Sequence, residues 1–149
     1  MPRVRVLIVG YGNPLRGDDG MGWHAAERLR ELELPGTEVL TVHQLTPELA
    51  EDLSRVDLAL FIDAREGGEP GSWRAEAVAP EADTSRAFTH HATPAGLIDN
   101  ARLLYGRAPE GVLFSMSGET FDYREGLSEP VAEALPAMLA AVVERVRAG

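Results

Sequence analysis

The chain has 149 residues, of which 44% are hydrophobic and 26% charged, and its formal net charge at pH 7 is −10. This length suits one domain spanning residues 1–149, and the composition is that of a globular protein rather than a disordered one. The acidic balance argues against nucleic acid as a partner, and the absence of cysteine and lysine excludes disulfide scaffolds, cysteine nucleophiles and Schiff bases.

The first half of the chain predicts strands and helices in alternation. The apolar run at Val4–Val9 is too short for a membrane span and enters a glycine turn, which favours a buried strand over a signal peptide. Without a membrane segment we expect a cytoplasmic protein. The elements expected next are a helix at Gly20–Glu31, a strand at Thr37–Val42, a helix that Thr46 and Pro47 start and that ends near Arg55, and a central strand at Leu58–Ile62.

The second half continues the alternation. The expected elements are a half-exposed strand at Ser72–Val78, a helix at Thr93–Tyr105 that ends before Gly106, a strand at Val112–Met116 and a helix at Ser128–Arg147. Pro136 is expected to kink or split the last helix. Such alternation predicts an α/β sandwich with a mainly parallel sheet between helices, whose ligands bind beyond the carboxyl ends of the strands.

The turn at Gly10–Gly20 is the first candidate site. It is not a dinucleotide-binding loop, because the third glycine of that motif would fall at Leu15. It ends instead in two adjacent carboxylates, Asp18 and Asp19, where a helix opens. Capping of that helix explains one of them and leaves the other available for chemistry.

Two further segments carry candidate ligands. Asp63 follows the expected central strand, and His90 and His91 precede the helix at 93–105, where neighbouring side chains would point in opposite directions. His24 and His43 have no sequence context that indicates a role. Two carboxylates and one imidazole can supply three ligands to a divalent ion and leave a position open, and such ligands suit zinc, nickel, manganese or iron.

Residues 9–22 read V-G-Y-G-N-P-L-R-G-D-D-G-M-G, which resembles the signature of the hydrogenase maturation proteases. These peptidases trim the C-terminus of the nickel–iron hydrogenase large subunit. Asp63, the segment 89–91 and the Leu-Ser at 127–128 match later parts of the pattern, so the resemblance covers essentially the whole chain. It implies a three-layer α/β/α sandwich around a five-stranded sheet.

The resemblance also implies the site and the reaction. Asp19, Asp63 and His91 would contact the metal, and the spacing to Gly106 favours His91 over His90. Asp19 and Asp63 are the expected catalytic residues. The expected partner is a hydrogenase large-subunit precursor, which brings nickel with it; zinc or another divalent ion could serve as a surrogate. Cleavage would release the precursor's C-terminal tail.

Several points stay open on the sequence alone. Either Asp18 or Asp19 could face the site, and Asp18, Asp63 or a metal-activated water could supply the base. Ser115 and Ser117 are expected to be loop or cap residues rather than nucleophiles. Ser115–Glu119 departs from the acidic segment often found there in the family. The alternative functions are a non-catalytic metal-sensing or chaperone module and a metal-assisted hydrolase of a small substrate.

Overall fold

A computed structural model describes residues 5–79 and 92–148 of the chain. Strands and helices alternate along most of it, as the sequence predicts. In chain order the elements are β1 (Val6–Tyr11), the short 3-10 helix η1 (Gly17–Gly20), α1 (Met21–Glu31), β2 (Thr37–Val42), α2 (Leu49–Leu53), β3 (Leu58–Arg65), β4 (Trp73–Ala77), α3 (Pro94–Tyr105), β5 (Glu110–Ser117) and α4 (Glu129–Ala148). No helix in the described ranges is long and apolar enough to cross a membrane.

The five strands form one sheet in the order β2-β1-β3-β5-β4. Strands β2, β1, β3 and β5 run parallel, and the edge strand β4 pairs antiparallel with β5. The expected mainly parallel sheet is therefore confirmed. Residues 58–62 of β3 are buried on both faces, which is why an uninterrupted apolar run marks the centre of the sheet.

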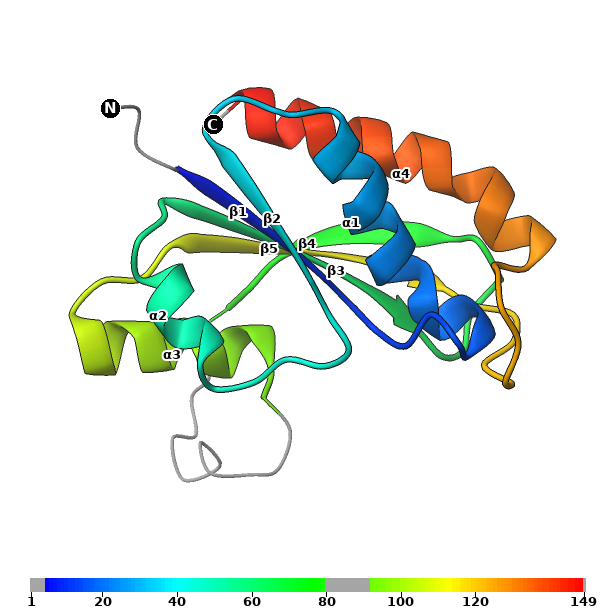
Figure 1. Ribbon diagram of the computed structural model, residues 1–149, viewed down its shortest axis with the longest axis horizontal. Helices are drawn as coiled ribbons and strands as arrows, with labels where there is room; N and C mark the ends of the chain where they lie inside the picture. Colours follow the sequence, from blue (N-terminus) through cyan, green and yellow to red (C-terminus); the bar gives the residue numbers. More distant parts are fainter. Residues whose placement is uncertain (1–4, 80–91, 149) are drawn as a thin grey trace.

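Helices cover both faces of the sheet, with α1 and α4 on one side and α2 and α3 on the other (Figure 1). Two apolar cores result, because successive side chains of each strand point to opposite faces. Ile8 and Leu60 pack toward α1 and α4, whereas Leu7 and Phe61 pack toward α2 and α3. The three-layer α/β/α sandwich is confirmed.

Several boundaries differ from the expected ones. Strand β1 continues to Tyr11, and β3 runs to Arg65, so Asp63 lies within the strand rather than after it. Ser115 and Ser117 lie inside β5, so their interpretation as loop residues is wrong. These strands are longer than expected because their last residues still pair with a neighbouring strand: Tyr11 with Val42, and Asp63 with Ser115.

Of the two Thr-Pro pairs expected to start helices, only the one at Thr93 does so. The Thr93 hydroxyl accepts a hydrogen bond of 3.0 Å from the Gly96 amide, as a cap before proline should. Thr46 makes no such cap, since α2 begins only at Leu49 and is much shorter than expected. Helix α4 runs through Pro136 as one element, so the split considered from the sequence does not occur.

Candidate functional site

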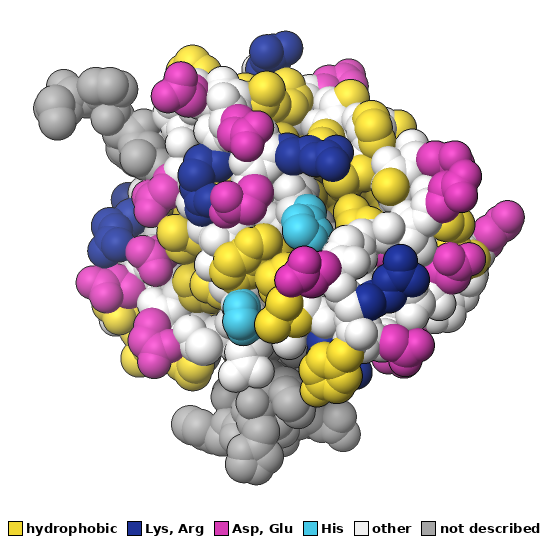
Figure 2. Space-filling model, turned by 45° about the vertical axis from the view of Figure 1, so that its right-hand side comes forward, with side chains coloured by type: hydrophobic (Ala, Val, Ile, Leu, Met, Phe, Trp, Pro, Cys, Tyr) yellow, Lys and Arg dark blue, Asp and Glu magenta, His cyan; other side chains and the backbone are white. Residues whose placement is uncertain are grey.

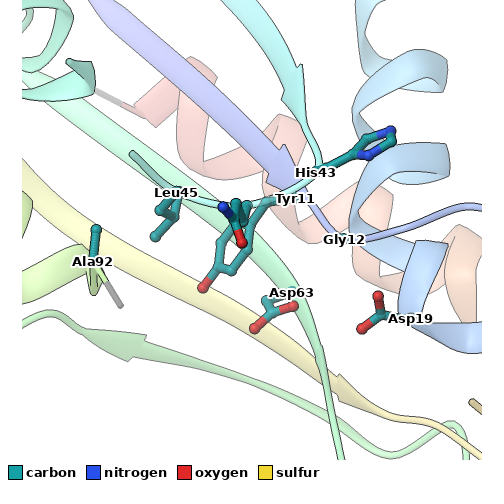
Figure 3. A pocket seen from close by; sticks show the side chains of 8 residues that line it. Tyr11, Gly12, Asp19, His43, Leu45, Asp63 and Ala92 are labelled. Atoms are coloured by element: carbon teal, nitrogen blue, oxygen red, sulfur yellow. The ribbon is translucent and has the colours of Figure 1, made fainter. Parts of the chain in front are cut away.

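A pocket opens where β1, β2 and β3 end, at the carboxyl edge of the sheet (Figure 3). Its volume is about 230 Å³. This is the edge at which parallel α/β sheets bind their ligands. The lining residues are Tyr11, Gly12, Asp19, His43, Gln44, Leu45, Asp63 and Ala92. The structure thus brings Asp19 and Asp63, two of the predicted site residues, to one pocket.

Asp63 enters the pocket from the central strand. The parallel register places it beside Ser115 of β5 and one residue beyond the Gly10–Ile62 pair of β1 and β3. Burial raises the pKa of Asp63 to about 7; the charge of Asp19 adds to the rise, and hydrogen bonding by Tyr11 and the Ala64 backbone offsets only part of it. A carboxyl group poised near neutrality can both take and return a proton.

Asp19 enters the pocket from η1. Its Oδ2 accepts a hydrogen bond of 2.8 Å from the Asn13 amide, which ties η1 back to the turn after β1. Gly12 permits this approach, because a Cβ there would lie 1.8 Å from the Asp19 carbonyl oxygen and its φ is +138°. A Cβ at Gly22 would lie 2.2 Å from the Ile62 carbonyl oxygen. Close contact between α1 and the strands therefore sets Asp19 opposite Asp63.

Asp18 does not line the pocket. It is fully buried, and its carboxylate accepts hydrogen bonds from the amides of Glu119 (2.7 Å), Thr120 (3.2 Å) and Ser128 (2.8 Å) and from the Ser128 hydroxyl (2.7 Å). Burial opposes ionisation of Asp18, but the hydrogen bonds from Ser128, Glu119 and Thr120 outweigh it and hold its pKa below the ordinary value.

Two roles considered for Asp18 do not fit its surroundings. Among the described residues neither η1 nor α1 has a side-chain cap, so Asp18 does not cap the helix that opens at this turn. A buried carboxylate with four donors also has no access to a reacting group in the pocket, which removes it as a candidate base. Of the two neighbouring aspartates, Asp19 is the one that lines the pocket.

The histidines contribute less than the sequence suggests. His90 and His91 lie outside the described residues; Ala92, which follows them, lines the pocket. Among residues 5–79 and 92–148, no three acidic, histidine or cysteine side chains form a ready metal cluster. The ring of His43 is turned toward α1, where it meets Trp23 edge-on with 5.1 Å between ring centroids (Figure 3). In α1, the buried Nε2 of His24 has no hydrogen-bond partner among the residues that the structure describes.

The two serines of β5 hold neighbouring strands together. The Ser115 hydroxyl accepts a hydrogen bond of 2.9 Å from Arg65, and the Ser117 hydroxyl accepts one of 3.3 Å from Ser72. Neither serine lines the pocket.

Tyr11 is one of the pocket residues that sequence reasoning missed. It stands between the two glycines of the turn, at a position that the motif leaves variable, and only the extension of β1 brings it to the sheet edge. Burial raises the pKa of the Tyr11 hydroxyl, and the charge and hydrogen bonding of Asp63 raise it further, so the phenol stays protonated.

Charges of both signs are mixed on one face of the molecule (Figure 2). On the face drawn in Figure 2, arginine side chains are separated by acidic and hydrophobic ones. The described residues on that face form no continuous basic surface.

Comparison with known proteins gives a consistent result, although no protein-family model matches the chain. A protein of Methanocaldococcus jannaschii, provisionally named a hydrogenase maturation protease, is 27% identical over 157 residues, covering 99% of each chain. The [NiFe] hydrogenase maturation protease HycI of Thermococcus kodakarensis is 26% identical with a TM-score of 0.71, over 95% of this chain and 92% of HycI. The hydrogenase maturating endopeptidase HybD of E. coli shares the fold, with a TM-score of 0.76 and 23% identity over 96% and 92% of the two chains. The resemblance to hydrogenase maturation proteases is confirmed.

Proposed function

We propose that this chain is a cytoplasmic endopeptidase that removes the C-terminal tail of a nickel-loaded hydrogenase large-subunit precursor. One observation carries the proposal: Asp19 and Asp63, from separate segments that both match the protease pattern, face a single pocket at the ligand-binding edge of the sheet. The relatives in sequence and fold are named as peptidases of hydrogenase maturation.

The nickel in this proposal belongs to the substrate. Asp19 and Asp63 offer carboxylate oxygens, and we assign His91 as the nitrogen donor that completes the set. A divalent cation fits this pocket because the Asp19 charge helps raise the pKa of Asp63 above its ordinary value, and a cation would relieve that repulsion. Zinc would bind the same donors as a surrogate.

Hydrolysis needs a group that accepts a proton and later returns it, and Asp63 suits this role. Water adds to the carbonyl carbon of the peptide bond while Asp63 takes one of its protons. The bond to nitrogen then breaks, and Asp63 gives the proton to the departing amine. Asp63 enters the pocket from the central strand, so its carboxyl is placed to exchange this proton.

The test is cleavage of a purified precursor, in nickel-loaded and nickel-free forms, with the released tail measured by mass spectrometry. We expect tail release only from the loaded precursor. The Asp63→Asn variant should lose at least about 100-fold in kcat, the usual contribution of a general base. Glu66→Gln, an exposed carboxyl at the end of the same strand region, is the matched control and should cleave normally.

The alternatives predict other outcomes. Stable binding of the loaded precursor without cleavage would overturn the peptidase in favour of a metal-sensing or chaperone module. Turnover of small substrates by a tightly retained metal would favour a small-molecule hydrolase. Calorimetric titration of the Asp19→Ala, Asp63→Ala and His91→Ala variants with loaded precursor tests the ligand set, since each should weaken binding.

A further inference from the structure

We propose that the Tyr11 hydroxyl donates the hydrogen bond that stabilises the oxyanion formed on the scissile carbonyl, an inference that rests on the peptidase function proposed above. Acyl transfer needs such a donor, because negative charge develops on the carbonyl oxygen in the transition state. Tyr11 would then be a catalytic residue that touches the reacting atoms.

The first support is the position of Tyr11. It is the last residue of β1, paired with Val42 of β2, and it lines the pocket together with Asp63. Its ring packs against the apolar core that includes Leu45. Figure 3 shows the ring between Leu45 and Asp63, with the hydroxyl directed into the pocket. Packing of the ring holds the donor in place before substrate arrives, which is what makes an oxyanion donor effective.

The second support is the chemistry of the other lining side chains. Asp19 and Asp63 are acceptors when ionised, and the His43 ring is turned toward Trp23 rather than into the pocket. Gln44 carries an amide, but its side chain is exposed. Among the described lining residues, Tyr11 is therefore the partly buried side chain that offers a proton donor.

The third support is the contact between Tyr11 and Asp63. Both side chains line the pocket, and each is among the causes of the other's pKa shift, so the donor and the proposed base lie close together. When substrate binds, the carbonyl oxygen becomes the acceptor for the Tyr11 hydroxyl.

The reaction then balances. Water oxygen bonds to the carbonyl carbon, one water proton goes to Asp63, and the carbonyl electron pair moves onto oxygen, where Tyr11 donates to it without losing its proton. The carbon–nitrogen bond breaks, the electron pair leaves with nitrogen, and nitrogen takes the proton from Asp63.

The experiment compares the wild type with Tyr11→Phe, which keeps the ring and its packing and removes only the hydroxyl. Cleavage of nickel-loaded precursor and precursor affinity are measured for both. We expect kcat to fall about 100-fold, as for loss of one oxyanion donor, while precursor affinity stays within about twofold. Tyr105→Phe, which removes an exposed hydroxyl on α3, should cleave like the wild type.

The contrary results are distinct. An unchanged kcat in Tyr11→Phe would overturn the assignment and leave the peptidase intact. Weaker precursor binding with unchanged kcat would also overturn it, because Tyr11 would then contribute to binding the precursor and not to the transition state. A wild type that releases no tail would overturn the peptidase function and this inference together.

Discussion

The carboxylates of Asp18 and Asp63 have opposite surroundings. Asp18 receives four hydrogen bonds from the segment 119–128, and its pKa lies below the ordinary value despite full burial. Asp63 is only partly buried and faces Asp19. The hydrogen-bond contributions of Tyr11 and the Ala64 backbone do not offset the effects of burial and of the Asp19 charge, and its pKa rises to about 7. The protein supplies Asp18 with four hydrogen-bond donors, whereas Asp63 has fewer groups that stabilise its charge.

The difference separates a structural role from a functional one. The Asp18 contacts bridge more than 100 residues of sequence and fix the segment 119–128 against η1, next to the turn that presents Asp19. The ionised form of Asp63 is disfavoured in the free protein, and binding of a substrate cation or of a proton would remove this penalty. Buried groups with incomplete partners and shifted pKa values are common at active sites, and fully partnered ones are common in structural networks.

The largest effect on stability should come from removing the Asp18 carboxylate. Asp18→Ala leaves the amides of Glu119, Thr120 and Ser128 without their acceptor, and we expect the free energy of unfolding to fall by about 3–5 kcal/mol at pH 7. Urea unfolding measures the change. Glu119→Gln changes an exposed side chain in the same loop and should stay within about 0.5 kcal/mol of the wild type.

The stability difference between the wild type and Asp18→Ala should depend on pH. The pKa of Asp18 is depressed in the folded state, so its stabilisation is present above the unfolded value near 4 and is lost as pH falls through the folded pKa. The gap between the wild type and Asp18→Ala should therefore narrow in acid. A gap that is constant down to pH 2 would mean that packing rather than charge holds the loop.

The opposite change is expected at Asp63. Its folded pKa is raised, so it contributes stability below the unfolded value near 4 that is lost as pH rises through about 7. Asp63→Asn does not titrate, and the metal-free variant should be more stable than the wild type by about 1–3 kcal/mol at pH 8, with the gain vanishing toward pH 4. Thermal unfolding at the two pH values measures it.

A stabilised but inactive Asp63→Asn variant would strengthen the comparison, because it would show that the charge is kept for function at a cost in stability. Glu66→Gln is again the control, since its exposed carboxyl should show no pH-dependent gain. Destabilisation of Asp63→Asn at pH 8 would mean that Asp63 is satisfied in the free protein and that the contrast with Asp18 is false.

A smaller effect should follow from weakening the Asp18 network at one point. Ser128→Ala removes the hydroxyl that donates to Asp18 over 2.7 Å and leaves the three backbone donors in place. We expect a loss of about 1.5–2 kcal/mol, the usual value for a hydrogen bond to a charged group. Ser72→Ala, which removes an exposed hydroxyl just before β4 that donates to Ser117, should cost less, as urea unfolding would show. Equal losses would mean that Asp18 gains nothing from this hydroxyl.

The sequence was most informative where structure is local or follows from sheet geometry. The apolar run at 58–62 predicted a central strand. The rule that parallel strands present ligands at their carboxyl ends placed the turn after the first strand and Asp63 at one edge, and the family resemblance pointed to Asp19 within that turn. The role of Asp18 could not be predicted, because its donors lie 101 to 110 residues away. Tyr11 also gave no signal, since its importance comes from the length of β1 rather than from a motif.

The smallest effect tests the link between the two pocket carboxylates. Asp19→Asn removes a negative charge facing Asp63 while keeping the size of the side chain. Because the Asp19 charge adds to the effect of burial, the pKa of Asp63 should fall but stay above its ordinary value. Carbon-detected NMR titration of the Asp63 carboxyl measures this shift. Asp52→Asn, on the exposed side of α2, is the control and should leave the Asp63 pKa in place. An unchanged pKa in Asp19→Asn would mean that burial alone sets the charge of Asp63, and that the two aspartates share a pocket without acting on each other.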